Sequence, residues 1–176
     1  MSESPAFIAV GSNIEPRRNI IAALTLLRDR VNVRASSTFY RTKPLGGKRQ
    51  PDFVNGVWRI ASNLSDAQLK HDVLAVIESR LGRVRTADRF APRTIDLDLV
   101  MCVSEADTVG VTTLPHPDVS RPFVHVPIIE LLEDAGHEIE ATLLAALRAR
   151  LPASGAATIP GEPLDDLTAE LRRLLT

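Results

Sequence analysis

Two aspartates, two positions apart, are the most specific chemical feature of the sequence. Asp96 and Asp98 alternate with the apolar residues Ile95, Leu97 and Leu99. Because successive side chains of a strand point to opposite faces, both carboxylates share the face away from the core, about 6.5–7 Å apart along the chain. Carboxylate oxygens are hard ligands that suit Mg²⁺, so the pair could hold one or two such ions. The alternative is an ordinary solvated strand face, although adjacent like charges disfavour a strand that has no counter-charge.

Four arginines lie directly before this pair and supply that counter-charge. Arg83, Arg85, Arg89 and Arg93 fall within eleven residues, opposed there only by Asp88. The planar guanidinium group donates in pairs to phosphate oxygens. Taken singly, each arginine is expected to form a surface ion pair worth about 0–1 kcal/mol. Taken together beside two carboxylates, they predict a site for a polyphosphate.

An aromatic ring and an amide share one face of another predicted strand. Phe53 and Asn55 are two residues apart, and this combination suits a flat heterocycle through stacking and paired hydrogen bonds. The alternative is a core residue beside a satisfied amide. His116 lies between two prolines and is interpreted either as a phosphate donor or as a turn residue. Three other aromatic residues, Trp58, Phe90 and Phe123, are assigned to the core. The remaining histidines, His71, His125 and His137, are assigned to structural or surface positions.

The sequence contains no established nucleotide-binding loop. Residues 46–48 (GGK) lack the leading glycine and the following Ser or Thr of a P-loop, and nothing matches G-x-G-x-x-G. If ATP binds, the metal and the arginines must therefore hold its phosphates.

The elements that must position these side chains alternate between strands and helices. Alternation of apolar residues predicts strands, and a 3.6-residue period predicts helices. The strands are expected at 6–11, 31–40, 53–62 and 95–102, and the helices at 16–30, 65–82, 127–135 and 140–150. The first six elements have the order β-α-β-β-α-β, typical of a ferredoxin-like α+β fold with a mainly antiparallel sheet, and helices follow it. We expect function in the polar loops 41–52 and 83–94, because binding residues concentrate on loops held by a rigid scaffold.

Length and composition predict one folded domain. The 176 residues are 44% hydrophobic, which suffices for a core, and we assign 1–150 to a single domain. We interpret 151–163 as a linker and 164–175 as a short C-terminal helix. The net charge of −1 disfavours a nucleic-acid partner. With a single cysteine, no run of about 18 apolar residues and no signal peptide, we expect a cytoplasmic protein with no membrane partner. A monomer is our expectation for the oligomeric state, which no feature of the sequence determines.

Five motifs, taken together, resemble those of a known family. RFAPRTIDLDLV at 89–100 is similar to the signature of the 6-hydroxymethyl-7,8-dihydropterin pyrophosphokinases of the folate pathway. AVGSN at 9–13, FYRTKPLG at 39–46, QPDFVN at 50–55 and GRVR at 82–85 match as well, in the family's order and spacing.

This resemblance implies a three-layer α-β-α fold and the transfer of pyrophosphate from ATP to the pterin's hydroxymethyl group, with release of AMP. It implies two Mg²⁺ ions held by Asp96 and Asp98, and catalytic arginines at Arg83 and Arg93. The positions that match ATP contacts are Glu78, Arg85, Arg89, His116 and Arg121, and those that match the pterin pocket are Thr42, Leu45, Phe53, Asn55 and Phe123.

The sequence departs from the family pattern at a few positions around the expected site. Phe53 and Phe90 stand where the family often has Tyr and Trp, and Lys43 stands where it often has Pro. Thr86 and Val111 stand where a basic residue is common, so two auxiliary phosphate contacts lack their usual donor. None of these changes touches the two aspartates or the two principal arginines.

Two other functions fit part of the pattern. A generic metal-dependent nucleotidyl- or phosphotransferase would use the same carboxylates and arginines, and pterin-dependent consumption of ATP separates it from a pterin enzyme. A single-stranded RNA-binding domain shares the β-α-β-β-α-β order, but it stacks bases on sheet aromatics within a basic surface. Aromatic residues are only 4% here, and the last strand presents carboxylates where RNA would require cations.

Overall fold

The computed structural model describes residues 3–47, 49–88, 90–102, 116–135, 145, 159 and 161–176. The strands in these ranges are β1 (Ser4–Ser12), β2 (Asn32–Ser36), β3 (Tyr40–Thr42), β4 (Phe53–Ser62), β5 (Asp96–Cys102) and β6 (Gly161–Pro163). The helices are α1 (Pro16–Arg28), α2 (Asp66–Gln68), α3 (Ala75–Arg80), α4 (Pro122–Asp134) and α6 (Asp165–Arg173). A π-helical segment, Leu69–Leu74, joins α2 to α3, and 3₁₀ turns lie at Leu45–Gly47 and Pro117–Ser120.

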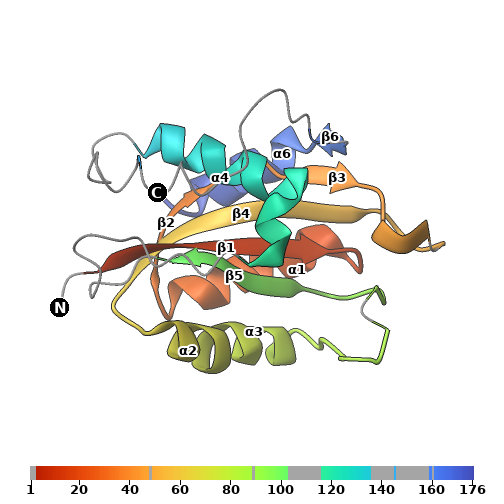
Figure 1. The fold of residues 1–176 in the computed structure, drawn as a ribbon, viewed down its shortest axis with the longest axis horizontal. Coiled ribbons are helices and arrows are strands. Elements are labelled where there is room, and N and C mark those ends of the chain that lie inside the picture. The colour runs from red at the N-terminus through yellow and green to blue at the C-terminus, as the bar shows by residue number, and fades with distance from the viewer. Residues whose placement is uncertain are drawn as a thin grey trace.

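The described strands form one antiparallel sheet in the order β5-β1-β4-β3-β6, and β2 also pairs with β4 (Figure 1). β1 is hydrogen-bonded to β4 along its whole length, from Ser4 opposite Ser62 to Ser12 opposite Val54. It also pairs with β5 on its other side. The predicted mixed fold with an antiparallel sheet and helices is confirmed.

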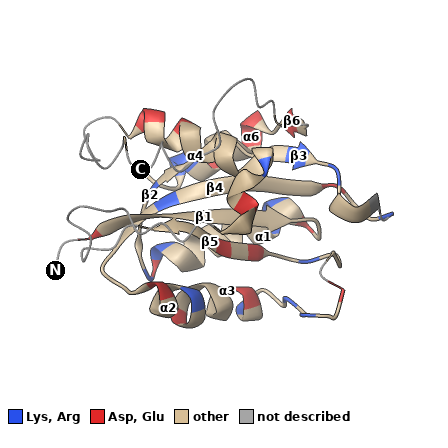
Figure 2. Cartoon of the chain, viewed as in Figure 1, with Lys and Arg blue, Asp and Glu red and all other residues tan. Residues whose placement is uncertain are grey.

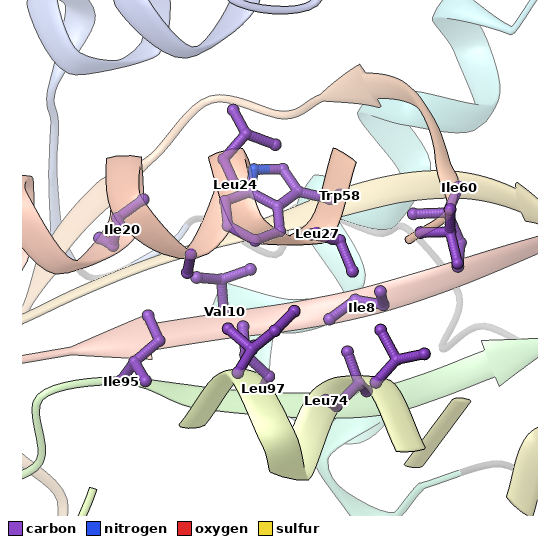
Figure 3. Close-up of a cluster of buried hydrophobic side chains, with 14 of the residues drawn as sticks. Ile8, Val10, Ile20, Leu24, Leu27, Trp58, Ile60, Leu74, Ile95 and Leu97 are labelled. Atoms are coloured by element: carbon purple, nitrogen blue, oxygen red, sulfur yellow. The ribbon is translucent and has the colours of Figure 1, made fainter. Parts of the chain in front are cut away.

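Helices cover both faces of the sheet. Over one face, α1 and α3 bury a cluster that includes Ile8, Leu24, Trp58 and Leu97 (Figure 3). Over the other face, α4 packs on a second cluster that includes Phe7. Trp58 is fully buried, which confirms its assignment to the core. Because strand residues alternate between the faces, this packing fixes which face each polar strand residue occupies.

Local signals set the helix ends where they were predicted. Ser65 and Gln68 form a reciprocal capping box at the start of α2, and Pro16 occupies the first turn of α1. Gly82 follows α3 with a φ of 74°, the left-handed conformation that commonly ends a helix. No helix in the described ranges is both long and apolar enough to cross a membrane.

The structure differs from the predicted elements in three places. The strand expected at 31–40 is divided into β2 and β3, with a break at 37–39. The helix expected at 127–135 begins five residues earlier at Pro122 and tolerates Pro127 in its interior, so the proline does not mark the helix start. Residues 161–163, which we placed in a linker, form β6, and α6 follows where the leucine spacing predicted a helix. The helix expected at 140–150 lies outside the described residues, apart from residue 145.

Candidate active site

The floor of the site is a row of residues across three neighbouring strands. Gly11 on β1 lies opposite Asn55 of β4 and opposite Asp96 of β5, and Ala9 lies opposite Asp98. Directly paired residues of antiparallel strands share a face, so the carboxylates and the amide point to the same side. This confirms that Asp96 and Asp98 face away from the main core.

Gly11 leaves the space that separates the amide from the carboxylates. A Cβ atom at this position would lie 2.9 Å from Asn55 Oδ1 and 3.8 Å from the Asp96 Cβ. A larger residue would therefore push against the amide oxygen. The absence of a side chain on the central strand makes the floor continuous from β4 to β5.

A cavity of about 370 Å³ lies over this floor. Its wall contains eleven of the site residues expected from the sequence: Arg83, Arg93, Asp96, Asp98, His116, Arg121, Thr42, Leu45, Phe53, Asn55 and Phe123. Their convergence agrees with the expectation that loop 41–52 and the segment around Arg83 and Arg93 carry function. The role of each residue remains a prediction.

Asp96 is held by two arginines. Its carboxylate accepts a hydrogen bond from Arg93 Nη1 at 2.5 Å and forms an ion pair with Arg83 Nη1, also at 2.5 Å. The side chains of Asp96, Arg83 and Arg93 are 21%, 13% and 18% exposed, so these charges are largely removed from solvent. The counter-charge that the sequence required for this strand is therefore a direct contact. Figure 2 shows the acidic stretch of β5 in red.

Asp98 lies in a different electrostatic environment. Burial raises the pKa of its carboxyl to about 6, and the neighbouring charges of Asp96 and Glu78 raise it as well, while His116 and Arg83 lower it. Two carboxylates close together in a poorly solvated place favour protonation of one of them. The negative charge of an ionised Asp98 is therefore not fully balanced by the cationic groups around it.

Glu78 lies behind the cavity and anchors the arginine segment. Its buried carboxylate accepts hydrogen bonds from Arg83 Nη1, from Arg85 Nη2 at 2.9 Å and from the backbone N–H of Leu97 at 2.8 Å. Among the described residues, neither Glu78 nor Arg85 belongs to the cavity wall. Their contact with a nucleotide stays a prediction, and Arg89 lies outside the described residues.

Two aromatic rings of the wall each lie against a guanidinium group. The Cζ atom of Arg93 lies 5.9 Å from the centroid of the Phe53 ring, and Arg121 lies at the same distance from Phe123. Asn55 Nδ2 donates to Thr42 Oγ1 at 2.7 Å, which orients the amide. This part of the cavity therefore offers ring faces and an oriented amide, as a flat heterocycle requires.

Sequence reasoning missed three residues of the site. Asn13, the last residue of the motif at 9–13, accepts from the backbone N–H of Arg93 at 2.8 Å and donates to Gln50 Oε1 at 3.2 Å. Gln50 also donates to the carbonyl of Phe90 at 3.0 Å. Phe90, assigned to the core, is only partly buried and lines the cavity, so that assignment was wrong. All three residues lie within motifs that carry the family resemblance, at 9–13, 50–55 and 89–100, but their residue types alone predicted no role in the site.

The donor set fits a magnesium ion that is completed by a substrate. In the described part of the chain, no group of three or more His, Cys, Asp or Glu residues could enclose a metal. Mg²⁺ is commonly bound by one or two carboxylates together with phosphates and waters, and Asp96 and Asp98 are such a pair. The raised pKa of Asp98 is consistent with a carboxyl that needs a nearby cation to stay ionised.

These features describe a mixed α and β protein whose cavity joins a carboxylate pair and arginines, suited to phosphate groups, to rings and an amide suited to a flat heterocycle. The sequence profile of the 7,8-dihydro-6-hydroxymethylpterin-pyrophosphokinase family matches residues 7–133, and the chain belongs to this family.

Curated relatives agree with this assignment. A 2-amino-4-hydroxy-6-hydroxymethyldihydropteridine pyrophosphokinase of Haemophilus influenzae is 41% identical over 133 residues, which cover 73% of this chain and 82% of the relative. The Pseudomonas aeruginosa protein of the same name is 37% identical over 164 residues, covering 88% and 96%. The folic acid synthesis protein fol1 of Schizosaccharomyces pombe is 34% identical over 157 residues, covering 85% of this chain and 21% of that longer protein.

Proposed function

We propose that this chain transfers pyrophosphate from MgATP to the hydroxymethyl group of 6-hydroxymethyl-7,8-dihydropterin, releasing AMP, as a step of folate biosynthesis. Membership of the family supports the reaction itself. The observation that carries the proposal in this structure is the shared floor, where an amide–aromatic wall and a carboxylate pair lie on opposite sides of Gly11 in one cavity. A ring bound to Asn55 would place its substituent toward the carboxylates.

Different residues bind the pterin ring and the phosphates. Asn55, oriented by Thr42, hydrogen-bonds the pterin edge, while Phe53 and Phe123 contact its faces and Leu45 excludes water. Asp96 and Asp98 would hold two Mg²⁺ ions. When bound, these ions would neutralise part of the negative charge of the polyphosphate.

The arginines supply charge at the transferring group. The pterin hydroxyl oxygen forms a bond to the β-phosphorus as the bond between that phosphorus and the oxygen retained by AMP breaks, and the hydroxyl proton is released. Arg83 and Arg93 stabilise the negative charge that spreads over the phosphoryl oxygens. Because both arginines contact Asp96 in this structure, they must exchange that carboxylate for phosphate when the substrates bind.

The remaining polar residues are assigned to ATP. His116 and Arg121 lie in the cavity wall and can donate to phosphate oxygens, and Asp118 orients Arg121 through an ion pair of 3.1 Å. Arg85, Arg89 and Glu78 complete the proposed nucleotide side, with Glu78 fixing the direction of Arg85.

We also propose that the core of the fold is ferredoxin-like. The order β5-β1-β4-β3, with α1 and α3 over one face, supports a ferredoxin-like three-layer core. We further propose a monomer that acts in the cytoplasm.

The test is the identity of the nucleotide product. The protein is incubated with ATP, Mg²⁺ and 6-hydroxymethyl-7,8-dihydropterin, and AMP is separated from ADP by ion-exchange chromatography. We expect AMP to appear only when the pterin is present. Formation of ADP would instead indicate ordinary kinase chemistry, and AMP formed without the pterin would indicate hydrolysis of ATP by a generic phosphotransferase.

A further inference from the structure

The break between β2 and β3 determines how β3 meets the site. Ser37 leaves the strand direction by bonding Val57 twice, through its own N–H at 3.0 Å and through its Oγ, which accepts from the Val57 N–H at 2.9 Å. The Phe39 ring then passes over Gly56, where a Cβ would lie only 2.5 Å from the ring. β3 resumes at Tyr40, paired with Asn55.

Two backbone N–H groups at this break are satisfied by side chains from distant parts of the chain. The N–H of Thr38 donates to Glu130 of α4 at 2.9 Å, and the N–H of Phe39 donates to Thr168 Oγ1 of α6 at 3.0 Å. The carbonyl of Phe39 accepts from the N–H of Leu164 at 2.8 Å. Buried backbone groups require partners, so these contacts hold the break in one conformation.

Arg172 of α6 bonds both to Glu130 and to the chain beside the break. Its Nη2 donates to Glu130 Oε1 at 2.7 Å, and its Nε donates to the carbonyl of Ser36 at 3.1 Å. The side chain of Thr168 is buried, whereas that of Arg172 is about half exposed. The C-terminal helix therefore contacts the chain just before the break, at Ser36, and within it, at Phe39.

β6 extends the contact of the C-terminal segment along β3 as far as Thr42, a residue of the cavity wall. Gly161 pairs with Thr42, and a Cβ at Gly161 would lie 2.4 Å from the carbonyl oxygen of Arg41, so the two strands approach closely. Thr42 is the residue whose Oγ1 accepts from Asn55. The C-terminal segment thus supports the strand that orients the amide of the cavity floor.

We propose that Thr168 and Arg172 are positioning residues for the pterin side of the site, acting through the break and β3 on the Thr42–Asn55 hydrogen bond. This role rests on the proposed function, because it assigns that bond to pterin recognition. Both residues lie beyond residues 7–133, the part of the chain matched by the family profile. In the described part of the chain, the hydrogen bonds of α6 near the break end on Ser36, Phe39 and Glu130, so we expect the effect to pass along the chain into β3 and to fall on the pterin rather than on the nucleotide.

The test compares substitutions on one helix. Thr168→Val keeps the shape of the side chain but removes the acceptor for the Phe39 N–H. We expect the KM for the pterin to rise about threefold to tenfold, the equivalent of one neutral hydrogen bond, with kcat and the KM for MgATP within about twofold. Thr168→Ser, which keeps the hydroxyl, should restore the KM. The control is Glu170→Gln, also on α6, which breaks an exposed ion pair with Arg17 of α1. This substitution should leave both KM values unchanged.

A second readout follows positioning without turnover. The side-chain amide resonances of Asn55 in a ¹H–¹⁵N spectrum should shift in Thr168→Val and stay in place in Glu170→Gln. If Thr168→Val does not fold, Arg172→Gln takes its place in both measurements. Unmoved Asn55 resonances, or KM values that rise equally for both substrates, would overturn the role of α6. Wild-type protein that releases no AMP with the pterin would instead overturn the proposed function, and the Asn55 spectrum would still decide the positioning.

Discussion

Asp96 and Asp98 are two residues apart in the sequence, yet they have different surroundings. Asp96 already has two cationic partners, Arg83 and Arg93, whereas Asp98 is partly buried and has a raised pKa. A carboxylate pair of this kind is asymmetric before any ligand binds. Replacing one or the other by the neutral isostere should therefore produce different changes in stability.

We predict that Asp96→Asn and Asp98→Asn both reduce turnover by about 10²–10³-fold or more, because each removes a charge that Mg²⁺ requires. Asp96→Asn should also lower the free energy of unfolding by about 1.5–3 kcal/mol, since two largely buried guanidinium groups lose a charged acceptor. Asp98→Asn should raise the melting temperature of the ligand-free protein at pH 7.5, because it relieves repulsion. Single-turnover assays and thermal unfolding measure both effects, and equal melting shifts would contradict the asymmetry.

The amide of Asn55 gives a prediction for binding. Asn55→Leu keeps the volume but leaves the polar edge of the pterin unpaired, which should weaken its binding by about 1–3 kcal/mol. It also leaves Thr42 Oγ1 without its donor. Titration calorimetry with the pterin and with MgATP should show a loss for the pterin alone. Equal losses for both ligands would exclude Asn55 as a pterin contact.

The sequence predicted individual site residues well where the strand period decides the face. Alternation placed Asp96 and Asp98 on one side, and the structure confirms that face. It could not predict Asn13 and Gln50, because their hydrogen bonds join residues 37 and 80 positions apart, which no local pattern encodes.

Most elements were predicted, and the divided strand at 31–40 shows how distant contacts override a local pattern. Residues 31–40 alternate like one strand, and the break at 37–39 depends on the packing of Phe39 over Gly56 and on Glu130 and Thr168. None of these partners lies within the segment. The alternation of residue types over 31–40 therefore predicts that the segment is extended, but it does not predict where the strand is interrupted.

Gly56 provides a prediction for the break. A Cβ at this position would lie 2.5 Å from the Phe39 ring, so Gly56→Ala should lower the free energy of unfolding by about 1–3 kcal/mol through overpacking. Urea unfolding measures the change. The same substitution combined with Phe39→Leu should cost less than the sum of the two single changes, because the smaller side chain relieves the collision. Additive costs would show that Phe39 is not what excludes a side chain at Gly56.

At the scale of the whole molecule, one carboxyl makes the stability of the ligand-free protein depend on pH. The pKa of Asp98 rises from 3.8 to about 6 on folding, so well below pH 3.8 the carboxyl is protonated in both states and its burial carries no ionisation cost. Between about pH 3.8 and 6 the unfolded chain loses this proton while the folded protein still binds it, so stability falls by an amount on the order of 3 kcal/mol and stays lower above pH 6.

We therefore predict that Asp98→Asn gains stability relative to wild type as pH rises from about 4.5 to 7.5. Urea unfolding of both proteins across this range, without Mg²⁺, measures the difference. Mg²⁺ and ATP should reduce the difference, because a bound cation stabilises the ionised carboxylate only in the wild type. A difference that does not vary with pH would show that Asp98 titrates normally in the folded protein.

The short strand β6 has a consequence for how the molecule behaves in a crowded solution. Without it, β3 would end the sheet with unpaired N–H and C=O groups, a surface on which strands of other copies can add and aggregate. β6 covers that edge and is itself a poor template, since it is three residues long, carries the charged Glu162 and ends at Pro163, which has no N–H to donate. The contact that steadies the site thereby also protects this edge of the sheet from self-association.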